Sequence, residues 1–191
     1  MPGIDPTPMR KMALTGTPGT GKSAVARILA TDWPVEEVGD LGERLGTARR
    51  IGRRPGGIRT IDLAETRKAI ARGRGRDARL WVGHLAHLLP VRDAVVLRCH
   101  PRELARRLAR HGAHRPRDLR ENLLAEATDV ILVEALRLGR RVWEIDTTGR
   151  PLADVAREVG GRMRRRGSPS YGRIDWLGDP WVTEHLLEWS R

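Results

Sequence analysis

The chain has 191 residues, of which 31% are charged and 39% are hydrophobic, and its formal net charge is +12. This length fits one domain with a substantial core, and no apolar run is long enough to span a bilayer. Residues 1–8 lack the basic start and apolar core of a signal peptide, and the single cysteine, Cys99, excludes an internal disulfide framework, so we expect a cytoplasmic protein.

Apolar strands and helices alternate along the chain, which predicts an α/β fold with a parallel sheet covered by helices on both faces. The expected strands are residues 11–15, 34–38, 79–82, 94–97 and 142–145. The expected helices are residues 24–30, 64–72, 101–110, 117–138 and 151–163. Residues 49–59 are rich in Arg, Gly and Pro and are predicted to form a loop.

Residues 16–23 read Gly-Thr-Pro-Gly-Thr-Gly-Lys-Ser and match the pattern G-x-x-x-x-G-K-[ST] between a strand and a helix. The glycines allow backbone N–H groups to converge on phosphate oxygens, and the helix directs its positive end at the same point. Lys22 is expected to reach the β- and γ-phosphates, and the Ser23 hydroxyl is expected to ligate Mg²⁺. The predicted ATP-binding residues of this segment are Gly19, Thr20, Gly21, Lys22, Ser23 and Ala24.

Ligands of parallel sheets bind at the carboxyl ends of the strands, where several polar residues follow the predicted strands. Asp40 is expected either to shape an acceptor site or simply to cap a helix. Arg98 follows a buried strand and Arg107 lies on the next helix, and each either points at phosphates or is a solvated surface arginine.

Five segments in order give the chain a family resemblance. They are Leu14–Ser23, Val38–Leu41, Gly83–Pro90, Arg120–Leu123 and Glu144–Gly149. With these segments the chain resembles the archaeal adenylate kinases, which are related to a eukaryotic nuclear adenylate kinase that also serves small-subunit ribosome maturation.

The resemblance implies an adenylate-kinase-like P-loop domain over residues 9–163, with a monophosphate-binding region at 37–62 and a short lid at 110–121. Residues 164–191 are then a basic linker and a Trp-containing tail. The implied activity is transfer of the γ-phosphate of ATP to AMP, with ATP hydrolysis as a second activity. A small-subunit ribosomal protein or rRNA is an implied partner.

The resemblance also implies roles for further residues. His84 is expected to position water or phosphate, His111 to lie against ATP, and Arg110 to meet phosphate from the lid. Three departures stand out: Val82 replaces the usual acidic residue before Gly83, His111 stands where the lid usually has arginine, and the monophosphate region is strongly basic.

Several alternatives stay open at this point. The basic excess indicates either an RNA partner or a codon bias toward arginine. The tail is expected to pack as a flap on the core rather than to dock a partner. The residues Cys99, His100, His111 and His114 lack the paired spacing of a zinc site, so only Mg²⁺ is expected. Besides a nucleoside monophosphate kinase, the sequence allows an ATP-hydrolysing assembly factor for the small ribosomal subunit or a P-loop kinase for another metabolite. The oligomeric state is not predicted.

Overall fold

A computed structural model describes residues 11–51, 58–74, 77–110, 116–165 and 167–190. The main sheet has five parallel strands in the order β2-β5-β1-β6-β7. They are β1 (Met12–Thr15), β2 (Val35–Glu37), β5 (Leu80–Val82), β6 (Asp93–Arg98) and β7 (Arg141–Asp146). The helices are α1 (Lys22–Leu29), α2 (Val38–Leu45), α3 (Leu63–Ala71), α4 (Pro101–Arg110), α5 (Pro116–Ala127), α6 (Val130–Arg137), α7 (Leu152–Arg165) and α8 (Pro180–Trp189), with a short 3₁₀ helix η1 (Ala86–Leu88). This arrangement confirms the predicted α/β fold.

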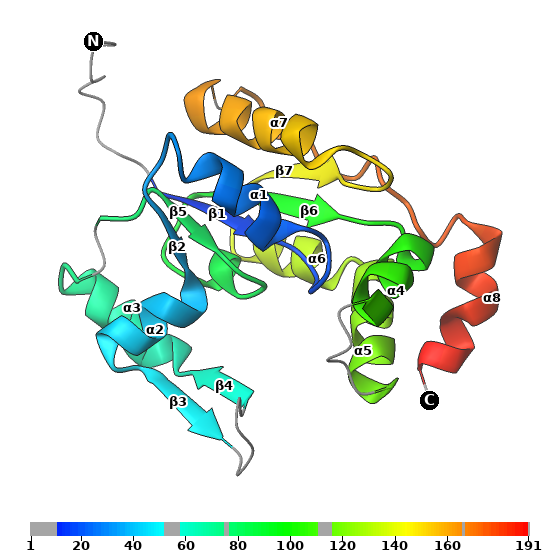
Figure 1. The fold of residues 1–191 in the computed structure, drawn as a ribbon, viewed down its shortest axis with the longest axis horizontal. Helices are drawn as coiled ribbons and strands as arrows, with labels where there is room; N and C mark the ends of the chain where they lie inside the picture. The colour runs from blue at the N-terminus through cyan, green and yellow to red at the C-terminus, as the bar shows by residue number, and fades with distance from the viewer. Residues whose placement is uncertain (1–10, 52–57, 75–76, 111–115, 166, 191) are drawn as a thin grey trace.

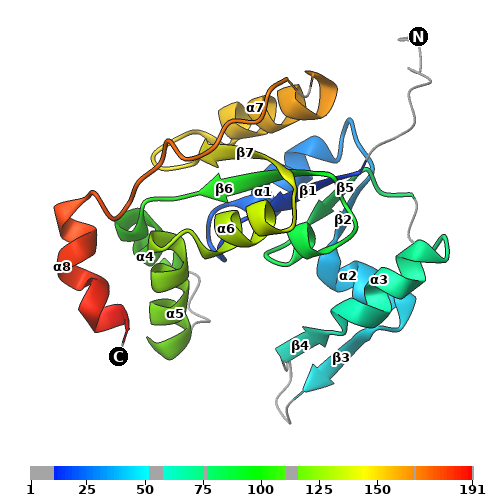
Figure 2. The same ribbon diagram turned by 180° about the vertical axis from the view of Figure 1, so that it is seen from behind.

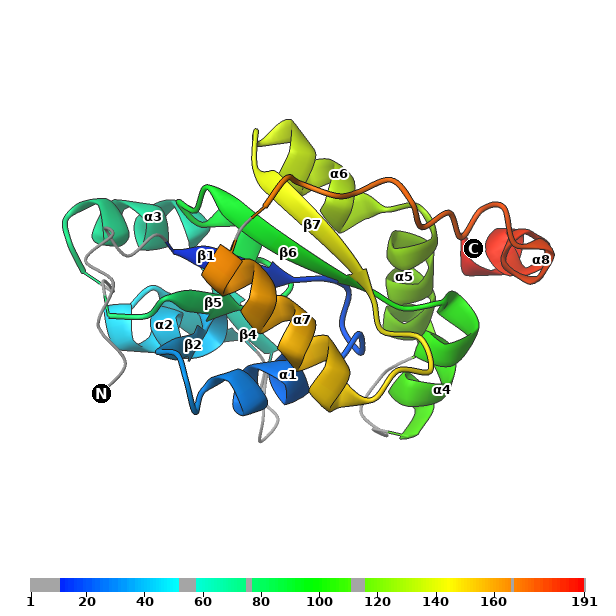
Figure 3. The same ribbon diagram turned by 90° about the horizontal axis from the view of Figure 1, so that it is seen from above.

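Helices cover both faces of the sheet (Figures 1 and 3). Successive residues of a strand point to opposite faces, and β1 shows the consequence. Leu14 packs into a cluster with Val25 of α1 and Val155 of α7. Ala13 points the other way, into a cluster with Leu41 of α2. The helix α6 covers another part of that second face (Figure 2). The central strands β1, β5 and β6 are therefore buried on both sides, as their continuous apolar runs predict.

The helix predicted over residues 117–138 is wrong as a single element. It is divided into α5 and α6, and the break lies at Asp129, whose φ of 58° is left-handed. Aspartate tolerates this conformation better than most residues. The turn lets the Asp129 carboxylate contact the buried guanidinium of Arg98. An ion pair from a distant strand thus overrides a continuous helical pattern.

The loop predicted at 49–59 is also partly wrong. The strand β3 (Ala48–Ile51) pairs antiparallel with β4 (Ile58–Ile61) in a separate two-stranded sheet, and residues 52–57 lie outside the described residues. Isoleucine and threonine have a high propensity for strands, which the loop prediction from Arg, Gly and Pro content did not weigh. This hairpin lies with α2 and α3 at one end of the molecule (Figure 1).

The C-terminal segment, residues 167–190, packs against the core, as the flap interpretation predicts. Ser170 forms a bridge with Trp143 of β7, and the Trp143 indole donates to the Ser168 carbonyl at 2.8 Å. Asp179 then caps α8, which packs beside α5. Within the described ranges, no helix is long and apolar enough to cross a membrane.

Candidate phosphate-binding site

The loop between β1 and α1 requires glycine at particular points. Gly16, Gly19 and Gly21 have φ values of 140°, 91° and 99°. A Cβ atom at Gly16 would lie 2.3 Å from the Leu97 carbonyl oxygen, and one at Gly19 would lie 2.8 Å from the Leu104 side chain. The loop is therefore pressed between β6 and α4, and only a chain without side chains at these points fits.

Lys22 lies inside this loop with only 8% of its surface exposed. Its Nζ donates to the Thr17 carbonyl at 2.9 Å. Burial lowers the pKa of Lys22 to about 8, although the nearby carboxylates of Glu126 and Glu37 act in the opposite direction. A buried ammonium whose partner is a loop carbonyl can exchange that carbonyl for a phosphate oxygen, which carries more negative charge.

The start of α1 fits a triphosphate with its metal ion. Gly21 precedes the helix without a side-chain cap, so the first-turn N–H groups face the loop without a capping side chain. Ser23 is exposed beside Lys22, and Ala24 follows it in the first turn. A hydroxyl oxygen is a ligand that Mg²⁺ accepts when phosphates and water complete its shell. These residues therefore fit Mg²⁺-bound ATP.

His84 lies just beyond the end of β5, and its side chain is exposed. Protein groups around the ring partly exclude water from it, and this desolvation, together with the positive charge of Lys22, lowers the pKa of His84. Its carbonyl accepts from the Thr15 hydroxyl at 3.3 Å. The structure thus brings His84 into the electrostatic field of Lys22, next to the strand that leads into the loop.

His87 is a residue that sequence reasoning did not single out. It is fully buried, and its Nδ1 lies 3.0 Å from the Thr15 hydroxyl. Its Nε2 lies 3.0 Å from a Glu134 carboxylate oxygen. The ring therefore joins β1, η1 and α6 and supports the strand that carries the loop. In the sequence, the apolar neighbours of His87 in residues 85–89 are the feature that could have indicated its burial.

Asp40 lies in the first turn of α2, and its side chain is exposed. The helix starts at Val38 with Glu37 at the N-cap position, so the structure does not support the interpretation of Asp40 as the cap. Glu37 also pairs in register with Val82 on the neighbouring strand. The resemblance leads us to expect an acidic residue at Val82, and the Glu37 carboxylate lies on the strand beside it. Sequence reasoning missed Glu37.

Arg98, which the sequence suggested as a phosphate ligand, is instead bound by carboxylates of the protein. Arg98 is 2% exposed, and it pairs with Glu126 at 2.8 Å, with Glu144 at 2.5 Å and with Asp129. All three of its nitrogens are held by these groups, so we do not assign Arg98 to phosphate. Its burial is stabilised by three carboxylates, which also raise its pKa.

Arg107 bonds within the protein as well. It donates to the Thr147 carbonyl at 2.9 Å and to a Glu103 oxygen at 3.2 Å, and so ties α4 to the loop after β7. Arg110 is exposed at the end of α4, where it is accessible to a ligand. His111 lies outside the described residues.

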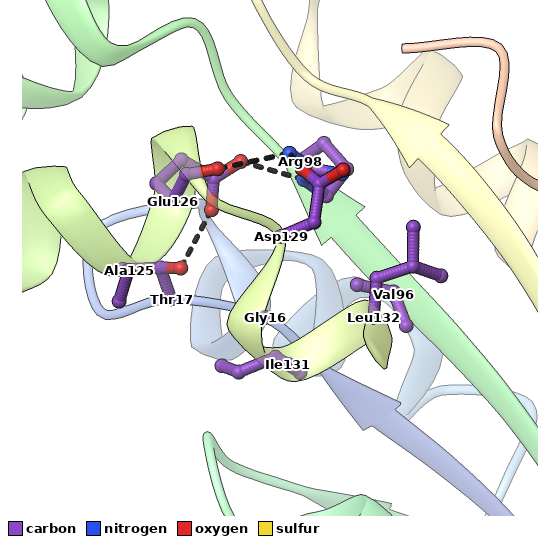
Figure 4. A pocket seen from close by; sticks show the side chains of 9 residues that line it. All are labelled: Gly16, Thr17, Val96, Arg98, Ala125, Glu126, Asp129, Ile131 and Leu132. Carbon is purple, nitrogen blue, oxygen red and sulfur yellow. Dashed lines mark hydrogen bonds and ion pairs between the residues drawn. The ribbon is translucent and has the colours of Figure 1, made fainter. Parts of the chain in front are cut away.

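Glu126 of α5 is a third site residue that sequence reasoning missed, after His87 and Glu37. Figure 4 shows its carboxylate between Thr17 of the loop and Arg98 of β6. The distances are 2.6 Å to the Thr17 hydroxyl and 2.8 Å to Arg98 Nε. Glu126 follows Leu123 by three residues and so lies on the apolar face of α5, and this position is the only hint of its burial that the sequence gives.

Comparison with known proteins agrees with this geometry. The family model described as "AAA domain" matches residues 12–129. The "Putative adenylate kinase" of Archaeoglobus fulgidus is 43% identical over 187 residues, covering 94% of this chain and 98% of its own. The protein of the same name from Thermococcus onnurineus is 36% identical over 166 residues, covering 86% and 90%.

A solved structure supports the fold. Shikimate kinase from Acinetobacter baumannii has a TM-score of 0.56 at 15% identity, and the match covers 83% of this chain and 94% of that enzyme. The archaeal part of the resemblance is confirmed, whereas the link to the eukaryotic nuclear enzyme stays a prediction. The chain belongs to the family described as "AAA domain" and to the archaeal family whose members are named "Putative adenylate kinase".

Proposed function

We propose that the protein is a nucleoside monophosphate kinase that transfers the γ-phosphate of ATP to AMP, with slow ATP hydrolysis as a second activity. The observation that carries this proposal is the buried Lys22 inside a glycine loop that opens into the uncapped start of α1. Family membership supports a kinase that acts on nucleotides. The choice of AMP as acceptor is the part that we propose.

In the proposed reaction an oxygen of the AMP phosphate attacks the γ-phosphorus of ATP. The bond from that phosphorus to the β–γ bridging oxygen breaks, and the electron pair leaves with ADP. Lys22 and the loop N–H groups stabilise the negative charge on the transferring group and on the departing ADP. Mg²⁺, held through Ser23 and the phosphates, supplies further charge neutralisation when it is bound.

We assign AMP, the proposed acceptor, to the region where β2 ends and α2 begins. Asp40 and Glu37 lie at the junction of β2 with this helix, close enough for Glu37 to influence the Lys22 ammonium. We propose that Asp40 contacts the acceptor nucleotide and that His84 orients its phosphate or an attacking water. We propose that Arg110, which is exposed at the end of α4, also contacts the phosphates.

The test is ADP formation by the purified protein from ATP and Mg²⁺, with AMP, CMP, UMP, GMP or no acceptor. The proposal predicts a rate that rises with AMP and two ADP formed for each AMP consumed. A rate that ignores every nucleoside monophosphate contradicts it. Phosphate release at such an indifferent rate would favour the ATPase alternative, and activity only with a non-nucleotide acceptor would favour another metabolite kinase.

A second candidate, an ATP-hydrolysing assembly factor for the small ribosomal subunit, is favoured by one observation. The last turn of α7 carries Arg162, Arg164 and Arg165, of which Arg164 and Arg165 are exposed, and Arg164 also lines a groove between α1 and α7. Clustered arginines attract RNA phosphates. This candidate predicts RNA binding that weakens steeply with salt and weakens further in Arg164→Glu. Equal binding of this variant and the wild type at every salt concentration would contradict it.

A further inference from the structure

Glu126 accepts hydrogen bonds from four donors that come from three separate parts of the chain. Its Oε2 accepts from the Thr17 hydroxyl at 2.6 Å. Its Oε1 accepts from Arg98 Nε at 2.8 Å, from the Cys99 N–H at 3.0 Å and from Trp176 Nε1 at 3.2 Å. The residue is 2% exposed, so these donors replace water around a buried carboxylate. One side chain thus joins the phosphate loop, β6 and the C-terminal segment.

The C-terminal segment reaches this carboxylate with a defined geometry. The Gly172 N–H donates to Glu144 Oε2 at 2.9 Å, so the segment also binds a second partner of Arg98. The ring of Trp176 meets His100 edge-on with centroids 5.1 Å apart, and His100 in turn lies 3.2 Å from the cap of α8, Asp179. Trp176 is therefore fixed on both sides, and its indole N–H is directed at Glu126.

Thr17 is the point where the loop receives this connection. Its carbonyl accepts from Lys22 Nζ at 2.9 Å and from the Thr20 hydroxyl at 2.9 Å. Its hydroxyl is the donor to Glu126. The residue whose carbonyl binds Lys22 is thus the same residue whose hydroxyl binds Glu126 of α5. A phosphate that takes the lysine from this carbonyl therefore changes the bonding of the same residue that Glu126 holds through its hydroxyl.

We propose that Glu126 is a positioning residue through which the C-terminal segment sets the conformation of the phosphate loop, by the chain Trp176 Nε1–Glu126–Thr17 Oγ1. The proposal rests on the proposed nucleotide binding at that loop. It adds that residues 167–190 belong to the nucleotide site although they do not face it. Nucleotide binding then changes the surroundings of the Trp176 indole, and loss of the indole donor weakens nucleotide binding.

The experiment uses the full chain and two readouts: calorimetric titration with ATP and Mg²⁺, and tryptophan emission during the same titration. Thr17→Val removes the hydroxyl at nearly constant volume, and Thr17→Ser retains it. Trp176→Phe removes the indole donor but keeps an aromatic ring. Trp181→Phe is the matched control, because Trp181 stacks on His185 in the same segment and does not bond Glu126 in the described contacts.

We expect ATP to change the wild-type emission, and Trp176→Phe to lose that change whereas Trp181→Phe keeps it. Thr17→Val should bind ATP about tenfold more weakly and lose the change, because a hydrogen bond to a charged group is removed. Thr17→Ser should restore most of both signals. Trp176→Phe should weaken ATP binding about threefold.

Wild-type affinity in both Thr17→Val and Trp176→Phe would overturn the proposal, and so would an emission change that survives in Thr17→Val. Circular dichroism during heating shows whether each variant is folded, and Trp176→Phe decides the case if Thr17→Val is not. Failure of the folded wild type to bind ATP would overturn the proposed function itself, and the coupling with it. Normal ATP binding without any effect of these variants overturns the coupling alone.

Discussion

The phosphate loop and the α2–α3 region are built in opposite ways. The loop is compressed between β6 and α4, and an added methyl group at Gly16 would meet a backbone oxygen at 2.3 Å. The α2–α3 region carries its own two-stranded sheet, its Thr47 bonds Thr66 at 2.7 Å, and apolar residues such as Leu41 of α2 anchor it to the main sheet. The donor side is thus enclosed between the main sheet and α4, whereas the acceptor side adds a separate small sheet at one end of the molecule (Figure 1). Changes on the two sides should therefore separate into effects on ATP and effects on the acceptor.

The largest expected effect comes from Lys22→Ala. Removing the ammonium takes away charge stabilisation in the transferring group, which costs on the order of several kcal/mol of transition-state stabilisation. The measurement is single-turnover ADP formation at saturating ATP. Arg27→Ala, an exposed change on the same helix, is the control and should retain the wild-type rate. Equal rates for Lys22→Ala and Arg27→Ala would show that Lys22 takes no part in phosphoryl transfer.

The next effect is on folding, from Gly16→Ala. The new Cβ would clash with the Leu97 carbonyl, and φ is 140°, so the free energy of unfolding should fall by about 3 kcal/mol. Gly161→Ala in α7 is the control, because nothing lies within 4 Å of its added Cβ, and it should be neutral or slightly stabilising. Urea unfolding of both variants measures the difference, and similar losses would show that the loop is not compressed.

The third effect is a pH dependence of ATP binding. The pKa of Lys22 is lowered to about 8, so the free protein loses this positive charge as the pH rises through that value. ATP affinity should fall about tenfold from about pH 7.5 to about pH 9. For stability the sign is reversed: the unfolded chain binds more protons between pH 8 and 10.5, so this group makes the free energy of unfolding rise over that window.

Lys22→Arg separates this pH effect from other titrations. Its guanidinium stays charged throughout, so ATP binding by this variant should not change over the same range. A parallel decline in the wild type and the variant would assign the titration to another group.

The smallest effect is expected on the acceptor side, from Asp40→Asn. The KM for AMP should rise about fivefold, because a charged hydrogen-bond acceptor is lost, and the Kd for ATP should stay unchanged. Glu43→Gln, an exposed change on the same helix, is the control for charge alone. A rise in the Kd for ATP in Asp40→Asn would contradict the separation of the two sides.

Short-range pattern was sufficient to predict the sheet, the loop and α1, because continuous apolar runs and a glycine motif act over a few residues. It was insufficient where charges meet across the fold. A buried Arg98 requires carboxylate partners, but sequence spacing does not show that these are Glu126, Asp129 and Glu144. The predicted helix breaks at Asp129, one of these partners. Glu126 was overlooked because a glutamate on a helix is usually solvated.

The central claim is that the loop and the first turn of α1 bind the phosphates of a nucleoside triphosphate. Calorimetric titration of the folded wild-type chain with ATP and Mg²⁺, beside Lys22→Ala, tests it most directly. The account predicts one ATP bound per chain with a Kd below about 1 mM, and at least about tenfold weaker binding by Lys22→Ala. Absence of heat from ATP or ADP with folded wild-type protein, or equal affinity in both chains, would contradict it.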